Sequence, residues 1–292
     1  MEEVVPSVQC VETSAGQSHR QAQEHNWLSL WHLLSLDAPT VAAVWTWFVA
    51  EATRASLPAV VPAAMFVAVW MLYAGDRLLD GVTGNEAMEE RHRFHHRHRY
   101  GFAVALVVAT GALVPLVAAI PWAILKLYLE LAGPLLLWFA IVHSIAPARG
   151  LQLPKELIPG AFWAAAMFAP VWHGNGFQHG ELAIAALCFG LLVTLNCWTI
   201  FAWEHQDVGQ AHSSTQLGVR WLREATIAGI AMPLVATLFA GPLLTPIFCA
   251  IALAAALLWM LDRSRASLQP THLRAAADLV LLTPLVLVAA LR

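Results

Sequence analysis

The chain has 292 residues, of which 59% are hydrophobic and only 12% are charged, and its mean hydropathy is +0.63. About a quarter of the residues in soluble domains are charged, so this composition excludes an ordinary soluble protein and predicts that most of the chain lies in lipid. The net charge of −3 indicates little about partners, because the position of each charge matters more in a membrane protein than the sum. We expect membrane lipids around the chain and no nucleic-acid partner.

The amino-terminal residues differ from the rest of the chain in being polar. Residues 1–25 carry four glutamates and lack a basic start followed by a short apolar stretch, so we expect a loose cytoplasmic tail rather than a cleavable signal peptide. Residues 26–36 then place Trp27, Leu30, Trp31 and Leu34 at helical spacing. This pattern predicts an amphipathic helix that lies in the membrane interface.

The remaining residues, 37–292, divide into apolar runs separated by prolines, glycines and charged loops. A membrane core of about 30 Å needs roughly 20 apolar residues per helix. The fold class that this predicts is an all-α polytopic membrane bundle of about nine transmembrane helices, expected at 38–56, 58–80, 100–119, 122–146, 157–173, 182–203, 222–240, 243–261 and 273–291.

The distribution of basic residues favours nine spans with the amino terminus inside. In this arrangement 13 of the 16 Lys and Arg residues fall on the inner face, leaving Arg54, Lys126 and Arg292 outside. Cytoplasmic loops are enriched in Lys and Arg, so we expect an integral protein of the inner, cytoplasmic membrane. The same topology puts the ends of spans two and six on the cytoplasmic side.

Two carboxylates stand at the end of the second predicted span, in the stretch "LYAGDRLLDG". Asp76 and Asp80 are four residues apart, so a helix places them on one face, where they repel unless a cation lies between them. Magnesium takes one or two carboxylates and completes its shell with water and phosphate oxygens. The alternative is a helix end at the interface, with Arg77 and the arginines of the following loop as ion-pair partners.

A second polar group closes the sixth predicted span, in "NCWTIFAWEHQDVG". Asn196, Glu204 and Asp207 share roughly one helical face if the helix continues that far. Two acidic helix ends on one side of a bundle could hold two metal ions around a diphosphate. A solvated loop with a chance acidic pair is the alternative. Basic groups at Arg149 and Lys155 precede span five and could neutralise phosphate oxygens.

The loop between spans two and three reads "EAMEERHRFHHRHRY". Its arginines could capture a diphosphate or lipid headgroups, or could serve only as positive-inside anchors. His92, His95 and His96 spell the H-x-x-H-H box of membrane di-iron enzymes. A site of that type needs several such boxes, and the sequence contains no second one.

Together these motifs resemble the UbiA family of intramembrane prenyltransferases. Members typically carry N-x-x-x-D-x-x-x-D at the end of the second helix; Asp76 and Asp80 match its aspartates, whereas Leu72 occupies the asparagine position. The second family motif has two or three aspartates, for which Glu204 and Asp207 stand in at shorter spacing. The resemblance implies a Mg²⁺-dependent transfer of a polyprenyl group from its diphosphate to an aromatic or other lipophilic acceptor.

The residues implied for this activity form two groups. Asp76, Asp80, Glu204 and Asp207 would be the catalytic magnesium ligands, and the contacts to the substrate diphosphate would come from Arg77, Arg149, Lys155 and Asn196.

Two other functions remain open on the sequence. One is a non-catalytic integral subunit of a larger membrane complex, or a binder of quinone, carotenoid or chlorin, that keeps the same fold. The other is a transporter whose coupling groups include Glu51 and Glu130, although no inverted repeat supports it.

Overall fold

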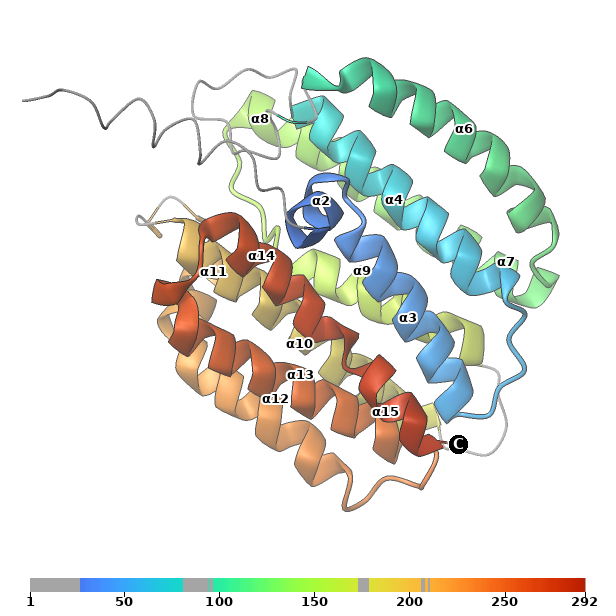
Figure 1. The fold of residues 1–292 in the computed structure, drawn as a ribbon, viewed down its shortest axis with the longest axis vertical. Helices are drawn as coiled ribbons and strands as arrows, with labels where there is room; N and C mark the ends of the chain where they lie inside the picture. The colour runs from blue at the N-terminus through green and yellow to red at the C-terminus, as the bar shows by residue number, and fades with distance from the viewer. Residues whose placement is uncertain are drawn as a thin grey trace, which may run out of the picture.

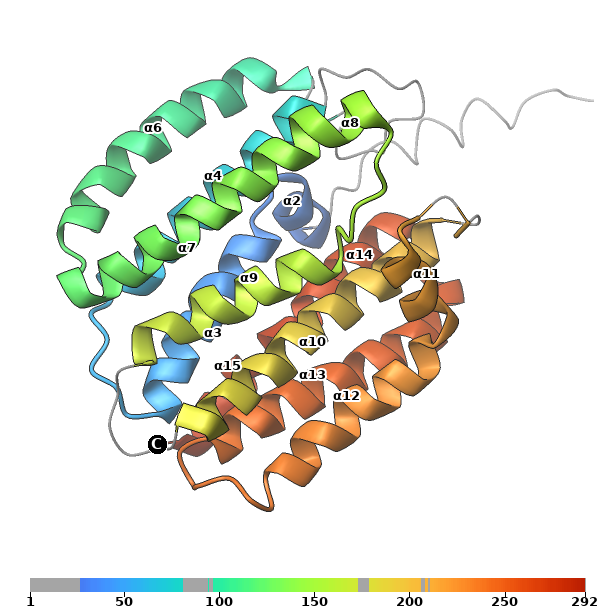
Figure 2. The same ribbon diagram turned by 180° about the vertical axis from the view of Figure 1, so that it is seen from behind.

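The computed structural model describes residues 27–80, 94, 97–172, 179–205, 208–209 and 211–291, and every regular element in these ranges is helical. The His92–His95–His96 box and Asp207 lie outside the described residues. Most of the helices run side by side along one direction, whereas the short α2 (Trp27–Leu33) crosses near one end of the bundle (Figures 1 and 2).

Five helices are long and apolar enough to cross a membrane. They are α4 (Val60–Asp80), α6 (Arg99–Ala118), α7 (Trp122–Ala140) with its extension to Ile145, α10 (His179–Glu204) and α13 (Thr245–Ser264) with the turn that follows it. These five agree closely with the second, third, fourth, sixth and eighth predicted spans, and they indicate an integral membrane protein. The break between Ala118 and Trp122 confirms the predicted separation of spans three and four.

The other four predicted spans are helices of reduced length. They correspond to α3 (Asp37–Ala52), α9 (Leu157–Phe168) with the 3₁₀ turn Ala169–Val171, α12 (Leu222–Ala236), and the pair α14 (Pro270–Leu279) and α15 (Pro284–Leu291). Two short helices complete the described fold, α8 (Ala146–Arg149) and α11 (Ser213–Arg220).

The ninth predicted span is interrupted between α14 and α15. Pro284 has no backbone N–H to continue the helical ladder, and a 3₁₀ turn, Val280–Leu282, joins the two pieces. Hydrogen bonds to neighbouring helices hold the interruption: Trp45 Nε1 of α3 donates to the Leu281 carbonyl at 2.8 Å, and the hydroxyl of Thr283, within the break, donates to the Ala250 carbonyl of α13 at 2.9 Å. The break is therefore a packed feature of the bundle.

The hydrophobic core lies around α3, which packs against α4, α9, α14 and α15. Trp45 and Phe48 of α3 are fully buried, and the Trp45 ring lies 4.5 Å from that of Phe189 of α10. By contrast, α6 and α7 bury almost none of their apolar surface within the chain. Their side chains therefore face lipid or another protein.

In the core, α9 and α10 approach each other closely through two glycines. A β-carbon added at Gly160 would lie 2.3 Å from Thr194 Oγ1 and 2.6 Å from the Gly190 carbonyl oxygen. Small residues at such crossings allow membrane helices to approach each other closely. By contrast, a β-carbon added at Gly133 of α7 would lie in open space, with nothing within 4 Å.

We therefore expect Gly160→Leu to separate α9 from α10 and to destabilise the protein by at least about 1–3 kcal/mol, the usual cost of overpacking a core. Tryptophan-fluorescence melting of the detergent-purified protein measures the effect. Gly133→Leu is the matched control and should leave the midpoint nearly unchanged. Equal midpoints for the two variants would contradict the α9–α10 packing.

Candidate functional site

Asp76, in the last turns of α4, faces the region where α7 ends. His143 Nε2 lies 2.9 Å from Asp76 Oδ1. His143 belongs to a π-helical segment, Ile141–Ile145, that continues α7. Such bulges are rare and often occur at functional sites, because the extra residue turns one side chain out of the regular helical register. The first predicted metal ligand thus has a basic partner.

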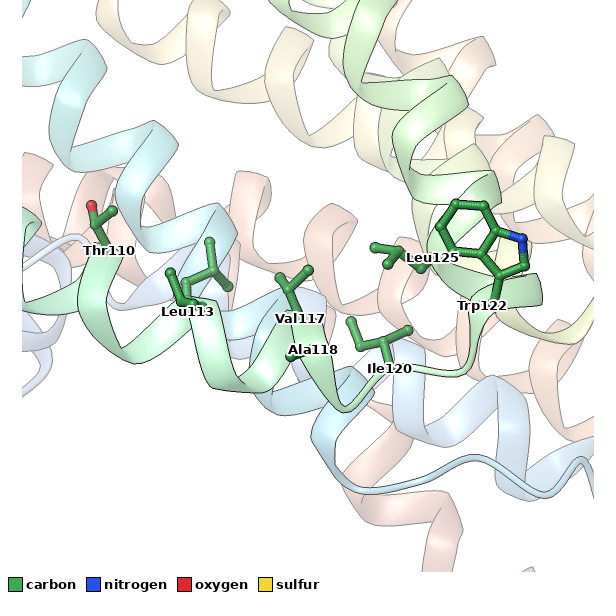
Figure 3. Close-up of a pocket in the computed structure, with 8 residues that line it drawn as sticks. Thr110, Leu113, Val117, Ala118, Ile120, Trp122 and Leu125 are labelled. Atoms are coloured by element: carbon green, nitrogen blue, oxygen red, sulfur yellow. The ribbon is translucent and has the colours of Figure 1, made fainter.

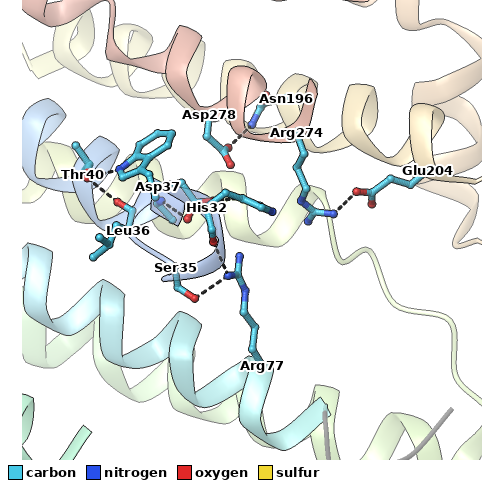
Figure 4. A network of polar contacts seen from close by, with 12 residues as sticks. His32, Ser35, Leu36, Asp37, Thr40, Arg77, Asn196, Glu204, Arg274 and Asp278 are labelled. Atoms are coloured by element: carbon cyan, nitrogen blue, oxygen red, sulfur yellow. Dashed lines mark hydrogen bonds and ion pairs between the residues drawn. The ribbon is translucent and has the colours of Figure 1, made fainter. Parts of the chain in front are cut away.

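Arg77, next in sequence, points into the bundle and is only 5% exposed. Its Nη1 atom donates to the His32 carbonyl oxygen at 3.0 Å and to Ser35 Oγ at 2.7 Å (Figure 4). Ser35 lies in the corner between α2 and α3 and has a positive φ of 58°, an uncommon conformation for a residue other than glycine. Arg77 therefore joins the end of α4 to the α2–α3 corner.

A buried pair at that corner lies next to Arg77. His32 Nδ1 and Asp37 Oδ2 are 2.5 Å apart, and the other oxygen of Asp37 accepts a hydrogen bond from the Ala38 N–H at 3.0 Å. Both side chains are about 2% exposed. Burial lowers the pKa of His32 below its ordinary value, although the hydrogen bond and the negative charge of Asp37 oppose that shift.

The second polar motif, at the end of α10, contacts α14. Asn196 Nδ2 donates to Asp278 Oδ1 at 3.2 Å, and Glu204 forms an ion pair with Arg274 (Figure 4). A carboxylate oxygen of Asp278 also lies within 4.8 Å of one of Asp37. One polar network thus runs from α10 through α14 to the α2–α3 corner.

The predicted site residues therefore divide into three sets. Arg77, Asn196 and Glu204 belong to one connected polar region, while Asp76 lies beside it with His143. Arg149, the last residue of α8, and Lys155, which precedes α9, are both exposed. The side chain of Asp80 and all of Asp207 lie outside the described residues.

The residues that sequence reasoning missed are His32, Asp37, Arg274 and Asp278. Arg274 and Asp278 both fall inside the predicted span 273–291, where ionisable groups are costly and by default mark a site. That signal was available in the sequence. His32 and Asp37 flank the start of span one and gave no comparable signal.

A group of side chains that could hold a metal ion lies apart from the acidic motifs. Among the described residues, the only group of three metal-ligating side chains is His32, Asp37 and Asp278. Asp76 and Glu204 belong to no such group within the same residues, and each has a basic partner instead. Glu51 and Glu130, the predicted transporter groups, are both exposed, and Glu130 lies 3.8 Å from Lys126.

One cavity among the described residues is remote from this polar region. It is an apolar groove of about 550 Å³ around the turn between α6 and α7, lined by residues such as Leu113, Val117 and Trp122 (Figure 3). Ile120 of that turn packs against Val61, near the start of α4, whereas Arg77 is close to its end. At 1.5 Å per residue the two places are about 24 Å apart along α4.

Comparisons with protein-family models, with curated proteins and with solved structures found no match to this chain.

The depressed pKa of His32 predicts how its contribution to stability changes with pH. The unfolded chain protonates His32 near its ordinary pKa of 6.5, whereas the folded state does so only at lower pH. Between the two values the unfolded state binds more protons, so this contribution is present above pH 6.5 and falls as the pH drops below it.

We expect His32→Gln to flatten the fall in melting temperature between about pH 8 and about pH 5. His205→Gln, which changes an exposed histidine, is the control and should keep the wild-type slope. Melting curves across this range provide the measurement. A wild-type slope in His32→Gln would show that His32 titrates normally in the folded protein.

Proposed function

We propose that the protein is an intramembrane prenyltransferase that transfers a polyprenyl group from its diphosphate to an aromatic or other lipophilic acceptor. The proposal includes the nine-span topology, with the amino terminus and the polar region on the cytoplasmic side. It is supported by the sequence resemblance in the acidic motifs and by the chemistry of the polar region between α4, α10 and α14.

The observation that carries the proposal is the hydrogen bonding of the buried Arg77 guanidinium. Both of its hydrogen bonds to described residues come from Nη1, which leaves the N–H groups of Nε and Nη2 without an acceptor in the described part of the chain. An almost buried guanidinium with donors to spare suits a phosphate group, because its planar fork binds phosphate oxygens in pairs. A diphosphate supplies such oxygens.

Arg274 provides a second positive charge on the same polar region. The two guanidinium groups are close enough to repel each other, and both act on His32. A bound diphosphate would relieve that repulsion. During the reaction the two guanidinium groups would also stabilise the negative charge that develops on the departing pyrophosphate.

The apolar bundle supplies the other requirement of this chemistry. When the bond between the allylic carbon and the diphosphate oxygen breaks, the electron pair leaves with pyrophosphate and an allylic cation remains. An electron-rich acceptor attacks that carbon and then loses a proton. Helices that exclude water protect the cation from hydrolysis, and aromatic side chains stabilise positive charge.

Magnesium remains part of the proposal, with Asp76, Asp80, Glu204 and Asp207 as the predicted ligands. The two of these whose side chains are described pair with His143 and Arg274, so a magnesium ion would have to compete with those contacts. This arrangement does not fit a preformed magnesium site, and the roles given to Arg77 and Arg274 do not depend on one.

The pairing of Asp76 with His143 and of Glu204 with Arg274 favours the second candidate function, because it occupies carboxylates that a catalytic metal ion would need. That function is a non-catalytic subunit or a quinone, carotenoid or chlorin binder with the same fold. A coloured absorbance spectrum of the purified protein, together with no release of pyrophosphate, would support that function over the transferase.

Arg77→Gln tests the diphosphate contact. We expect it to weaken binding of farnesyl diphosphate to detergent-purified protein by about 10- to 100-fold, since a charge-assisted contact contributes about 1.5–3 kcal/mol. Arg77→Lys should restore only part of the affinity, because lysine lacks the fork. Arg223→Gln, an exposed arginine of α12, is the matched control.

Equal affinities of wild type and Arg77→Gln for farnesyl diphosphate would show that Arg77 does not bind the diphosphate. Absence of binding and of pyrophosphate release by wild type across several acceptors would overturn the transferase proposal as a whole.

Asp76→Ala tests the predicted magnesium ligand separately. If magnesium binds between the acidic helix ends, farnesyl diphosphate binding by wild type should strengthen with added Mg²⁺, and this dependence should be lost in the variant. Titration calorimetry with and without Mg²⁺ measures it. Glu130→Gln, an exposed acidic residue of α7, is the control, and an unchanged magnesium dependence in Asp76→Ala would exclude Asp76 as a ligand.

A further inference from the structure

Three side chains from separate parts of the chain meet where α2, α3 and α14 join. His32 comes from α2, Asp37 from the start of α3 and Asp278 from the last turn of α14 (Figure 4). Each offers one nitrogen or oxygen atom, and these three atoms all lie within 4.8 Å of one another. None of the three belongs to the acidic motifs that carry the family resemblance.

The two carboxyl groups of this cluster need a positive partner between them. Carboxylate oxygens of Asp37 and Asp278 lie within 4.8 Å of each other, and Asp37 is almost completely buried. Two negative charges in contact cannot both persist in such a place unless they share a proton or hold a cation. Arg77 acts on the cluster electrostatically, but its hydrogen bonds go to the His32 carbonyl oxygen and to Ser35 Oγ.

An independent observation favours the cation. Asn196 is only 4% exposed; its Nδ2 atom donates to Asp278, while its Oδ1 atom is buried with no hydrogen-bond partner. A buried amide oxygen without a partner costs about 1–3 kcal/mol. Rotation of this amide about its last bond would turn Oδ1 toward the cluster, where a cation would satisfy it.

We propose that His32, Asp37 and Asp278, with the amide oxygen of Asn196 as a fourth ligand, bind one divalent transition-metal ion of the zinc class. Imidazole nitrogen favours zinc and its neighbours over magnesium, and carboxylate oxygens complete a mixed N/O set of four. Ligand atoms of a tetrahedral zinc lie about 3.3 Å apart, so small side-chain rotations would close the present spacing.

Binding would require His32 with its Nδ1 atom unprotonated and both carboxyl groups ionised, because metal ligands bind in their deprotonated forms. The ion would hold α2, α3, α10 and α14 together at this end of the bundle. The proposal is independent of the transferase activity, since metal content and metal-dependent stability are measured without substrate.

The test uses full-length protein purified in detergent, with His92, His95 and His96 replaced by alanine so that the histidine-rich loop cannot bind metal. We expect elemental analysis to find about one zinc per chain, and chelation to lower the melting temperature. Adding Zn²⁺ back should restore the melting temperature, and Mg²⁺ should not.

Asp278→Asn and His32→Gln each remove one ligand with little change in size. Each should lower the zinc affinity by more than about tenfold and abolish the effect of added Zn²⁺ on melting. Asn196→Ala should weaken binding less. Glu130→Gln should behave as the parent, because this carboxylate is exposed on α7.

Two results would overturn the proposal. The first is a parent protein whose melting temperature responds neither to chelation nor to Zn²⁺; this needs no variant and holds even if the variants fold poorly. The second is equal zinc content in the parent and in a folded Asp278→Asn protein. Failure of farnesyl diphosphate binding with zinc binding intact would overturn only the transferase.

Discussion

The burial of charge at one end of an apolar bundle is the constraint on which the rest of the structure depends. Ionisable groups inside such a bundle must pair or leave their charged form, because the surroundings cannot solvate them. Here Asp37 pairs with His32, Arg77 binds the α2–α3 corner, and Glu204 pairs with Arg274. The first contact joins the consecutive helices α2 and α3, and the other two join residues 45 and 70 positions apart, so compensation of charge also fixes which helices meet.

This constraint explains why α2 is more than a surface helix. Trp27 and Leu30 point outward, as the predicted interfacial helix requires, but His32 and Leu33 are buried against the bundle. The carbonyl of His32 accepts a hydrogen bond from Arg77 while its ring contacts Asp37. The helix therefore closes the polar region from one side, and the positive φ of Ser35 marks the turn that allows it.

The sequence predicted the long helices well and overestimated the length of several others, for a physical reason. Hydropathy and the punctuation at Pro121 located α6 and α7 to within a few residues, because a continuous apolar run leaves no other structure in lipid. Hydropathy could not show that the predicted span 273–291 is interrupted before Pro284. That break depends on Trp45 and Thr283, whose partners lie far away in sequence.

The candidate site shows the same limit. Arg77, Asn196 and Glu204 could be chosen because local spacing put them at the ends of predicted helices. The contact of Asp37 with Asp278 joins residues from the two ends of the chain, so no local pattern encodes it. The charges of Arg274 and Asp278 inside an apolar run were the usable signal, and they indicate a site without naming its partners.

The two proposed sites share the polar region, and their charges are complementary. Asp37 and Asp278 both act electrostatically on Arg77, so without a cation they reduce the positive field available to a phosphate. A divalent ion held by those carboxylates would neutralise them and leave Arg77 and Arg274 to attract the anion. Because such coupling is reciprocal, a bound diphosphate would tighten the cation in turn. Loss of the cation would therefore weaken diphosphate binding without removing any atom that touches the diphosphate.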